Sequence, residues 1–93
     1  MATVRVTAFE NVTPGSRFEE YRPDADLKLV GTFEVGGDSI EAALEDMFWV
    51  GNKQGPDSAG ARWPLDRRSM SVGDLVVVEG ETYAVDIVGF KAV

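Results

Sequence analysis

Two stretches in the N-terminal part of the chain alternate between apolar and polar residues. Residues 3–9 alternate over their whole length, and residues 27–35 do so until Gly36 interrupts the pattern. A period of two is typical of a half-buried β-strand, so we expect two strands that can pair in an antiparallel ladder. The segment between them, residues 10–26, carries proline and glycine turn signals and is predicted to be a loop.

A helix is predicted to begin at Asp38 or Ser39. Either side chain can accept orphan backbone N–H groups, and Glu41 lies three residues after Asp38, as in a capping box. The apolar residues that follow have helical spacing and form a stripe expected to face the core: Ile40, Ala43, Leu44, Met47 and Phe48. Gly51 and Asn52 are expected to end the helix.

A tight hairpin is predicted near the C-terminus. Residues 75–79 and 82–88 are rich in β-branched side chains and flank the dipeptide Gly80–Glu81. A glycine in the first position of a two-residue connection favours a type II′ turn. In the register that we expect, Val78 faces Tyr83 and the apolar residues share one face of the sheet.

The predicted order is therefore β-β-α-β-β. It is best satisfied by an α+β fold with a small mixed or antiparallel sheet of about four strands and one helix packed on a face. A chain of 93 residues has room for a single domain, residues 1–93, with one compact core. No signal peptide or membrane-spanning stretch is predicted, so we expect a cytoplasmic protein.

The composition excludes much ordinary catalysis. The chain has no cysteine and no histidine, which removes thiol chemistry, cysteine zinc sites and the commonest general base. No phosphate-binding loop or nucleophile motif occurs either. We therefore expect no catalytic residue, no metal site and no cofactor, and we predict that the protein is not an enzyme. A carboxylate enzyme would need two acids from separate elements to converge in one pocket.

The long connection after the helix, residues 51–73, differs from the rest of the chain in charge. It carries four basic and two acidic residues, whereas the formal net charge of the chain is −7. Arginine and tryptophan dominate many interfaces, and the same mixture can stack a base or clamp a phosphate. The partner-binding candidates from this connection and the preceding helix are Trp49, Lys53, Arg62, Trp63, Arg67 and Arg68. In the alternative interpretation, Trp63 and Pro64 fix the loop to the core and the arginines neutralise the acidic helix.

An acidic surface is predicted around the helix. Residues 31–50 carry five acidic residues and no basic one, namely Glu34, Asp38, Glu41, Glu45 and Asp46. Glu41 and Glu45 are four positions apart and repel each other on a helix. The surface is either simply solvated or meets a positively charged partner.

One segment resembles a known family. The residues Arg68-Ser-Met-Ser-Val-Gly-Asp-Leu-Val-Val-Val-Glu-Gly80, with Tyr83 and Val88-Gly-Phe90, are similar to the core of the YodL-like group of small domains. The preceding helix, with Asn52, is similar to that group's helix, so the resemblance covers about residues 40–90. It implies a genetic setting in phages, plasmids and other mobile elements, often of Gram-positive bacteria, and it implies no reaction.

These observations lead to one main hypothesis and two rivals. The main hypothesis is a non-enzymatic accessory protein of a phage or mobile element that binds a host or element-encoded protein. The first rival is nucleic-acid binding through the basic–aromatic loop, residues 53–68, which the net charge disfavours. The second is an acidic decoy of a nucleic-acid-binding enzyme. No membrane partner is expected, and exposed sheet edges would also permit a homo-oligomer.

Overall fold

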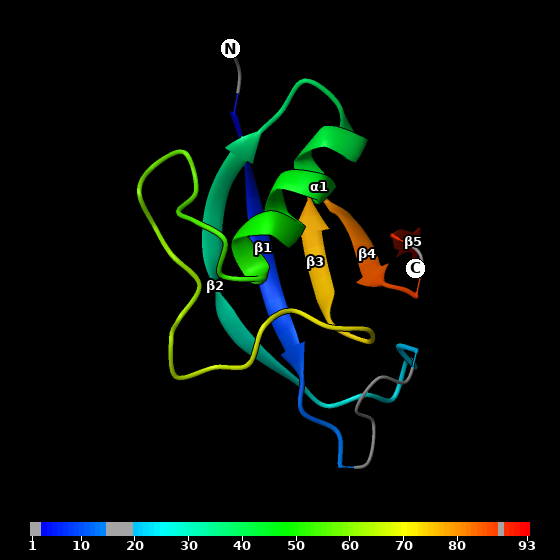
Figure 1. Ribbon diagram of the computed structural model, residues 1–93. Helices are drawn as coiled ribbons and strands as arrows, with labels where there is room; N and C mark the ends of the chain where they lie inside the picture. The colour runs from blue at the N-terminus through cyan, green and yellow to red at the C-terminus, as the bar shows by residue number, and fades with distance from the viewer. Residues whose placement is uncertain (1–2, 15–19, 88) are drawn as a thin grey trace.

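The computed structural model describes residues 3–14, 20–87 and 89–93 and has one sheet with one helix on its face (Figure 1). In chain order, the elements are β1 (Thr3–Asn11), β2 (Leu27–Gly36), α1 (Ile40–Gly51), β3 (Leu75–Val78), β4 (Glu81–Val85) and β5 (Phe90–Ala92). The strands form an antiparallel sheet in the order β2-β1-β3-β4-β5. The predicted α+β class is confirmed, and β5 is one strand more than the sequence indicated.

The central strand β1 explains why the two alternating stretches end up side by side. It pairs antiparallel with β2 on one side and with β3 on the other. Val6 lies opposite both Phe33 and Val78 and is fully buried. Its neighbours Arg5 and Thr7 point to the opposite face of the sheet, because side chains alternate along a strand. The polar half of the alternation therefore remains near solvent.

The β3–β4 hairpin is confirmed, but the predicted register and turn are wrong. The turn consists of Glu79 and Gly80, and both have positive φ angles, 51° and 79°. Val78 therefore faces Glu81, and Tyr83 faces Val76. Positive φ at both central residues defines a type I′ turn, in which glycine takes the second position. Each β3 residue therefore pairs with a β4 residue two positions earlier than predicted. Because a shift of two keeps every side chain on its side of the sheet, the apolar side chains still share one face.

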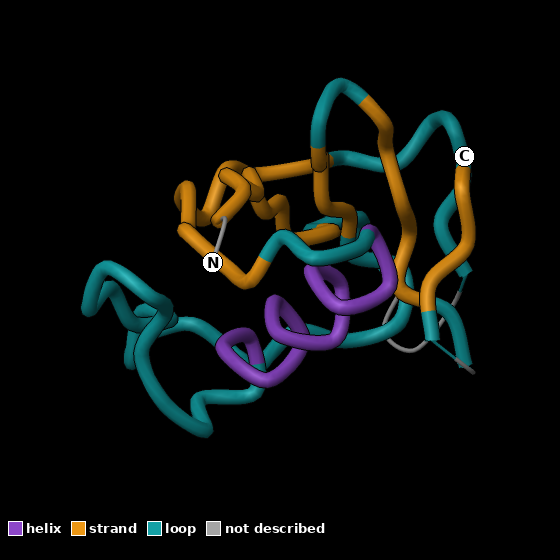
Figure 2. Tube along the Cα trace, turned by 90° about the horizontal axis from the view of Figure 1, so that it is seen from above, coloured by secondary structure: helices purple, strands orange, loops and turns teal. Residues whose placement is uncertain are grey.

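Helix α1 begins where the sequence predicted and buries most of the predicted stripe. The Ser39 side chain accepts a hydrogen bond of 3.0 Å from the backbone N–H of Ala42, which caps the helix. The buried positions of α1 are Ala43, Leu44, Met47, Val50 and Gly51. Phe48 departs from the prediction because it is 40% exposed. In Figure 2 the helix lies against one face of the sheet, with the long connection beyond it.

The connection from residue 52 to residue 74 packs against β2. Trp63 is 2% exposed and stacks on Phe33, with ring centroids 5.8 Å apart. Its indole Nε1 donates to the backbone oxygen of Arg68 at 2.8 Å. Trp63 is thus part of the hydrophobic core, as the alternative interpretation of the loop proposed, and it fixes the connection to the sheet.

Asp57 attaches the same connection to the outer edge of β2. Its carboxylate accepts backbone N–H groups of Glu34 at 2.8 Å, Ala59 at 2.9 Å and Ala61 at 2.7 Å. The backbone N–H of Ser58 donates to the Glu34 oxygen at 2.9 Å. At this point the β2 edge is therefore covered by the chain itself.

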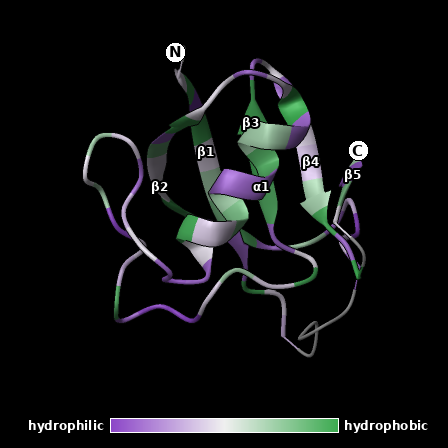
Figure 3. Ribbon diagram, turned by 45° about the horizontal axis from the view of Figure 1, so that its top comes forward, coloured by the Kyte–Doolittle hydropathy of each residue, from purple (hydrophilic) through white to green (hydrophobic). Residues whose placement is uncertain are grey.

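Hydropathy follows this layered arrangement. In Figure 3 hydrophobic colour gathers on the strands beneath α1, and hydrophilic colour marks the outward side of the helix. Helix α1 has twelve residues. Among the described residues, no helix is long and apolar enough to cross a membrane.

Candidate functional site

Two of the predicted partner-binding arginines are held by acidic side chains of the protein itself. Arg67 Nη1 lies 3.4 Å from Glu10 Oε1. Arg68 forms a two-pronged ion pair with Asp74, with Nη1 2.9 Å from Oδ2 and Nη2 2.8 Å from Oδ1. Arg68 Nε also lies 3.8 Å from Glu10 Oε2. Both guanidinium groups therefore join the C-terminal part of the long connection to the end of β1.

Asp74 is the centre of a closed polar network. Its side chain is fully buried, and it accepts the backbone N–H groups of Asn11 and Ser71, each at 2.9 Å, in addition to the two Arg68 bonds. The Asn11 side chain donates to the Gly73 oxygen at 3.1 Å. We call this set the Asp74 network; its members are Asn11, Arg68, Ser71, Gly73 and Asp74. A buried carboxylate with this many donors is stable because each lost water contact is replaced.

The Asp74 network explains the structural roles of Arg68, Ser71, Gly73 and Asp74. The ion pair with Asp74 raises the pKa of the Arg68 guanidinium above its usual value, although burial acts in the opposite direction. Gly73 has a φ of 93°, a conformation that favours glycine, and the Asp74 N–H closes the turn onto the Ser71 oxygen at 3.1 Å. The Arg68–Asp74 pair was missed, although an arginine and an aspartate flanking a turn were visible in the sequence.

The other predicted residues remain at the surface. Trp49 is 44% exposed, and its ring lies over Gly55 so closely that a Cβ there would collide with it. Lys53 and Arg62 are exposed, and Lys53 Nζ lies 3.4 Å from the Leu65 oxygen. The structure therefore divides the predicted set into Trp63, Arg67 and Arg68, which hold the fold, and Trp49, Lys53 and Arg62, which contact solvent.

A groove with a mainly apolar lining lies between α1 and β5. One hollow of about 330 Å³ is lined by Glu45, Phe48, Asp86, Ile87, Gly89 and Phe90. A second, of about 200 Å³, shares three of these residues and adds Glu41 and Leu44. We call the two together the α1–β5 groove. The sequence analysis did not identify it, because β5 was not predicted and Phe48 was assigned to the core.

The groove has an apolar floor and an acidic rim. Phe48 and Phe90 meet edge to face with ring centroids 6.1 Å apart, and Ile87 beside them is 78% exposed. Glu41 and Glu45 of α1 and Asp86 after β4 lie around this floor. Lys91, the basic residue next to Phe90, points to the other face of the sheet and lies 3.9 Å from Glu20. The groove thus combines exposed apolar surface with negative charge.

Two other acidic residues of the predicted surface, Glu34 and Asp46, have partners within the protein. Glu34 Oε1 accepts a hydrogen bond from Arg5 Nε at 3.1 Å. Asp46 Oδ2 accepts the backbone N–H of Gly36 at 2.9 Å. The predicted acidic surface is therefore not uniform, and Glu41 and Glu45 are the members that border the groove.

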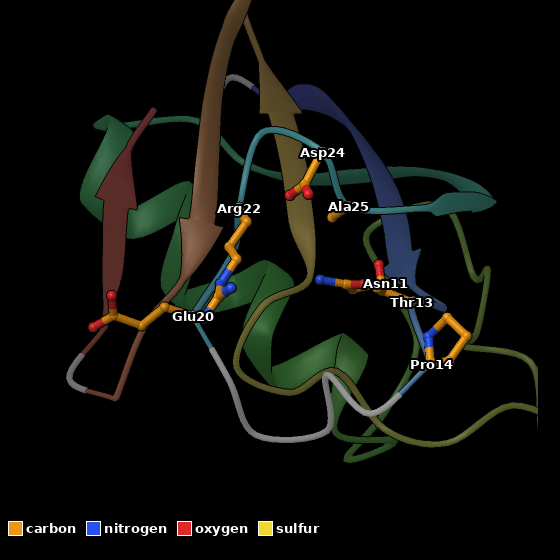
Figure 4. A pocket seen from close by; sticks show the side chains of 7 residues that line it. All are labelled: Asn11, Thr13, Pro14, Glu20, Arg22, Asp24 and Ala25. Atoms are coloured by element: carbon orange, nitrogen blue, oxygen red, sulfur yellow. Dashed lines mark hydrogen bonds between the residues drawn. The ribbon is translucent and has the colours of Figure 1, made fainter.

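A polar hollow lies at the opposite end of the sheet. It has a volume of about 160 Å³ and is lined by Asn11, Thr13, Pro14, Glu20, Arg22, Asp24 and Ala25 (Figure 4). Two of its lining residues act within the fold: Asn11 belongs to the Asp74 network, and Thr13 Oγ1 accepts the N–H of Asp26 at 2.7 Å. Residues 15–19 of the predicted loop, which include Phe18, lie outside the described residues. We therefore place the candidate site in the α1–β5 groove.

Comparisons with known proteins identify no relative of this chain. No protein-family model matches the chain, and no curated protein or solved structure matches it either. Within the described residues, no group of three or more acidic side chains converges closely enough to hold a metal ion.

Proposed function

We propose that this protein is a non-catalytic binding module that holds a segment of another protein in the α1–β5 groove. The observation that carries this proposal is Ile87, an aliphatic side chain 78% exposed beside the half-exposed ring of Phe48. Exposed apolar side chains gathered in a hollow and rimmed by polar groups are typical of interaction sites. In the Asp74 network, by contrast, both carboxylate oxygens are already bonded to Arg68 and to backbone N–H groups.

Protein is favoured over nucleic acid as the partner. The groove is bordered by Glu41, Glu45 and Asp86, and phosphates would be repelled by these carboxylates. The basic loop that could attract phosphates has two of its arginines in ion pairs with Glu10 and Asp74. Its buried Trp63 has no face on which a base could stack.

The resemblance to the YodL-like group supports a phage or mobile-element origin for this binding module. It covers α1, the β3–β4 hairpin and the members of the Asp74 network from Arg68 to Asp74, and so includes the helical wall of the groove. We therefore propose an accessory protein of a phage or related mobile element, whose partner is a host or element-encoded protein.

The proposal is tested by affinity capture from host lysate in the presence of nuclease. The test variant is Ile87→Asp, which places a charge on the apolar floor of the groove. The matched control is Leu65→Asp, because Leu65 is an equally accessible aliphatic residue, 85% exposed, that does not line the groove. Both positions tolerate a polar residue without unfolding, since neither side chain is buried.

We expect a stoichiometric protein partner that wild type and Leu65→Asp retain and Ile87→Asp loses. The reverse pattern, with loss confined to Leu65→Asp, would move the interface to the basic–aromatic loop. A partner set that disappears with nuclease would instead favour nucleic-acid binding. Either result contradicts the proposal.

A further inference from the structure

The outer edge of β5 has backbone groups with no partner in the described part of the chain. In the β4–β5 ladder, Val93 N donates to the Thr82 oxygen at 3.0 Å, and Asp86 N donates to the Gly89 oxygen at 2.8 Å. In an antiparallel ladder, hydrogen-bonded pairs alternate with pairs whose N–H and C=O groups point away. The N–H and C=O groups of Phe90 and Ala92 therefore point outward, away from β4.

The β2 edge differs from the β5 edge where the long connection meets it, at Glu34. At β2, the Glu34 N–H and C=O are bonded to Asp57 and Ser58 of the same chain. At β5, no hydrogen bond covers the corresponding groups of Phe90 and Ala92 among the described residues. A short exposed edge beside an apolar groove is the arrangement on which extended peptides add as an extra strand.

We infer that the partner binds as an extended, basic segment that pairs antiparallel with β5 and places one apolar side chain in the α1–β5 groove. This inference rests on the proposed function and specifies how the groove is used. The pairing residue exchanges two hydrogen bonds with Phe90, since both backbone groups of Phe90 point outward. Its side chain then lies on the same face as the Phe90 ring, which is the face covered by α1.

Strand geometry also sets the pattern of the partner's sequence. Side chains one residue before and after the apolar anchor point to the far face of the sheet, and those two residues away return to the groove side. There they meet the rim carboxylates, Glu41, Glu45 and Asp86. The recognised pattern is therefore basic–any–apolar–any–basic.

The size and charge of the groove agree with this occupant. The α1 residues that line it run from Glu41 to Phe48, about 10 Å of helix, which is the length of roughly three extended residues. A second copy of this chain is a poorer occupant, because each copy carries a net charge of −7. Charge complementarity thus favours a basic segment of another protein.

Binding of synthetic peptides to the full chain tests the inference. The probe is a fluorescein-labelled peptide of sequence serine-lysine-threonine-leucine-threonine-lysine-serine, capped at both ends. The first control moves the leucine one position earlier, which puts both lysines on the opposite face at unchanged composition. The second control carries an N-methyl group on the leucine nitrogen, which removes the N–H that Phe90 would accept.

We expect the shifted peptide to bind about fivefold more weakly, because its ion pairs are lost. The N-methylated peptide should bind about tenfold more weakly, since one backbone hydrogen bond is removed. In the protein, Glu45→Gln should lower the affinity for the probe about twofold. The control Glu79→Gln removes an exposed acid in the β3–β4 turn and should leave that affinity unchanged.

Three results would overturn the inference: equal affinity for the probe and the shifted peptide, no effect of N-methylation, or no binding of the probe at all. A dimer in light scattering that Ile87→Asp dissociates would assign the groove to a second copy and would also overturn it. If the lysate partner is nevertheless lost in Ile87→Asp, the proposed function survives and only the mode of binding is wrong.

Discussion

The Asp74 network and the α1–β5 groove place carboxylates in two different surroundings. In the network, both oxygens of a fully buried aspartate are bonded to an arginine and to two backbone N–H groups. In the groove, the exposed carboxylates of Glu41 and Glu45 lie near the exposed side chains of Phe48 and Ile87. The carboxylate of the network has its hydrogen-bond partners within the chain, whereas the exposed carboxylates of the groove are accessible to a partner from outside.

This comparison shows why charge and aromatic content alone mislead about function. The basic–aromatic loop has the composition of an interface, yet Trp63, Arg67 and Arg68 stabilise the fold. The groove combines acidic and apolar residues, and its apolar side chains are left uncovered.

Replacing the aromatic side chain of the closed region should destabilise the protein most. We expect Trp63→Ala to lower the free energy of unfolding by about 4 kcal/mol, because it empties a buried site and breaks the stacking on Phe33. Phe48→Ala in the groove should cost about 1 kcal/mol, since its ring is partly solvated already. Urea unfolding measures both, and equal losses would contradict the division into closed and open regions.

Removing the central acid of the network should be the next largest effect. Asp74→Ala leaves the N–H groups of Asn11 and Ser71 without acceptors and Arg68 without its ion pair, and we expect a loss of about 3 kcal/mol. Glu45→Ala on the groove rim should change stability by less than about 0.5 kcal/mol. A small loss in Asp74→Ala would mean that the network does not hold the fold.

The closed edge of β2 should be sensitive to acid through Asp57. Burial raises the pKa of this carboxyl, but its hydrogen bonds from the backbone N–H groups of Glu34, Ala61, Ala59 and Gly60 outweigh burial, and the pKa is lowered. Its stabilisation is therefore complete above the unfolded value of about 3.9 and is lost as the pH falls through the lower folded value. We expect Asp57→Asn to cost about 1–2 kcal/mol at neutral pH. In urea unfolding at a series of pH values, that difference should shrink below about pH 4; a pH-independent difference would contradict this account.

The smallest effect on stability is expected in the groove floor. Ile87→Ser should change the free energy of unfolding by less than about 0.5 kcal/mol, because the side chain is mostly exposed. The same variant should bind the lysine–leucine–lysine probe at least fivefold more weakly, as one apolar contact is removed. A variant that is destabilised and still binds normally would reverse the roles of the two regions.

Much of the fold could be predicted from local patterns. The alternation of residues 3–9 and 27–35, the cap at Ser39 and the two aliphatic runs near the C-terminus located four strands and the helix. The hairpin register was missed because the type I′ turn depends on a positive φ at Glu79, a residue that rarely adopts it. Strand β5, only three residues long, was too short to have a period.

The candidate site could not be predicted because it depends on contacts between distant segments. Phe48 has the right spacing for the core stripe, yet it projects past the edge of the sheet, where Phe90 meets its ring and Ile87 lies beside it. Likewise, nothing local shows that Arg68 reaches the end of β1, where its Nη2 donates to the Asn11 oxygen at 3.2 Å. Only the excess of acidic residues in the segment 31–50 indicated which side of the helix a basic partner would meet.

Amide hydrogen exchange at β5 tests the central claim most directly. Free protein should exchange the outward N–H groups of Phe90 and Ala92 rapidly, and Lys91, which pairs with Ala84, should be protected as an internal reference. With the lysine–leucine–lysine probe at about ten times its dissociation constant, exchange at Phe90 should slow about tenfold. Unchanged exchange at Phe90 and Ala92 while the probe is bound would contradict strand addition at this edge.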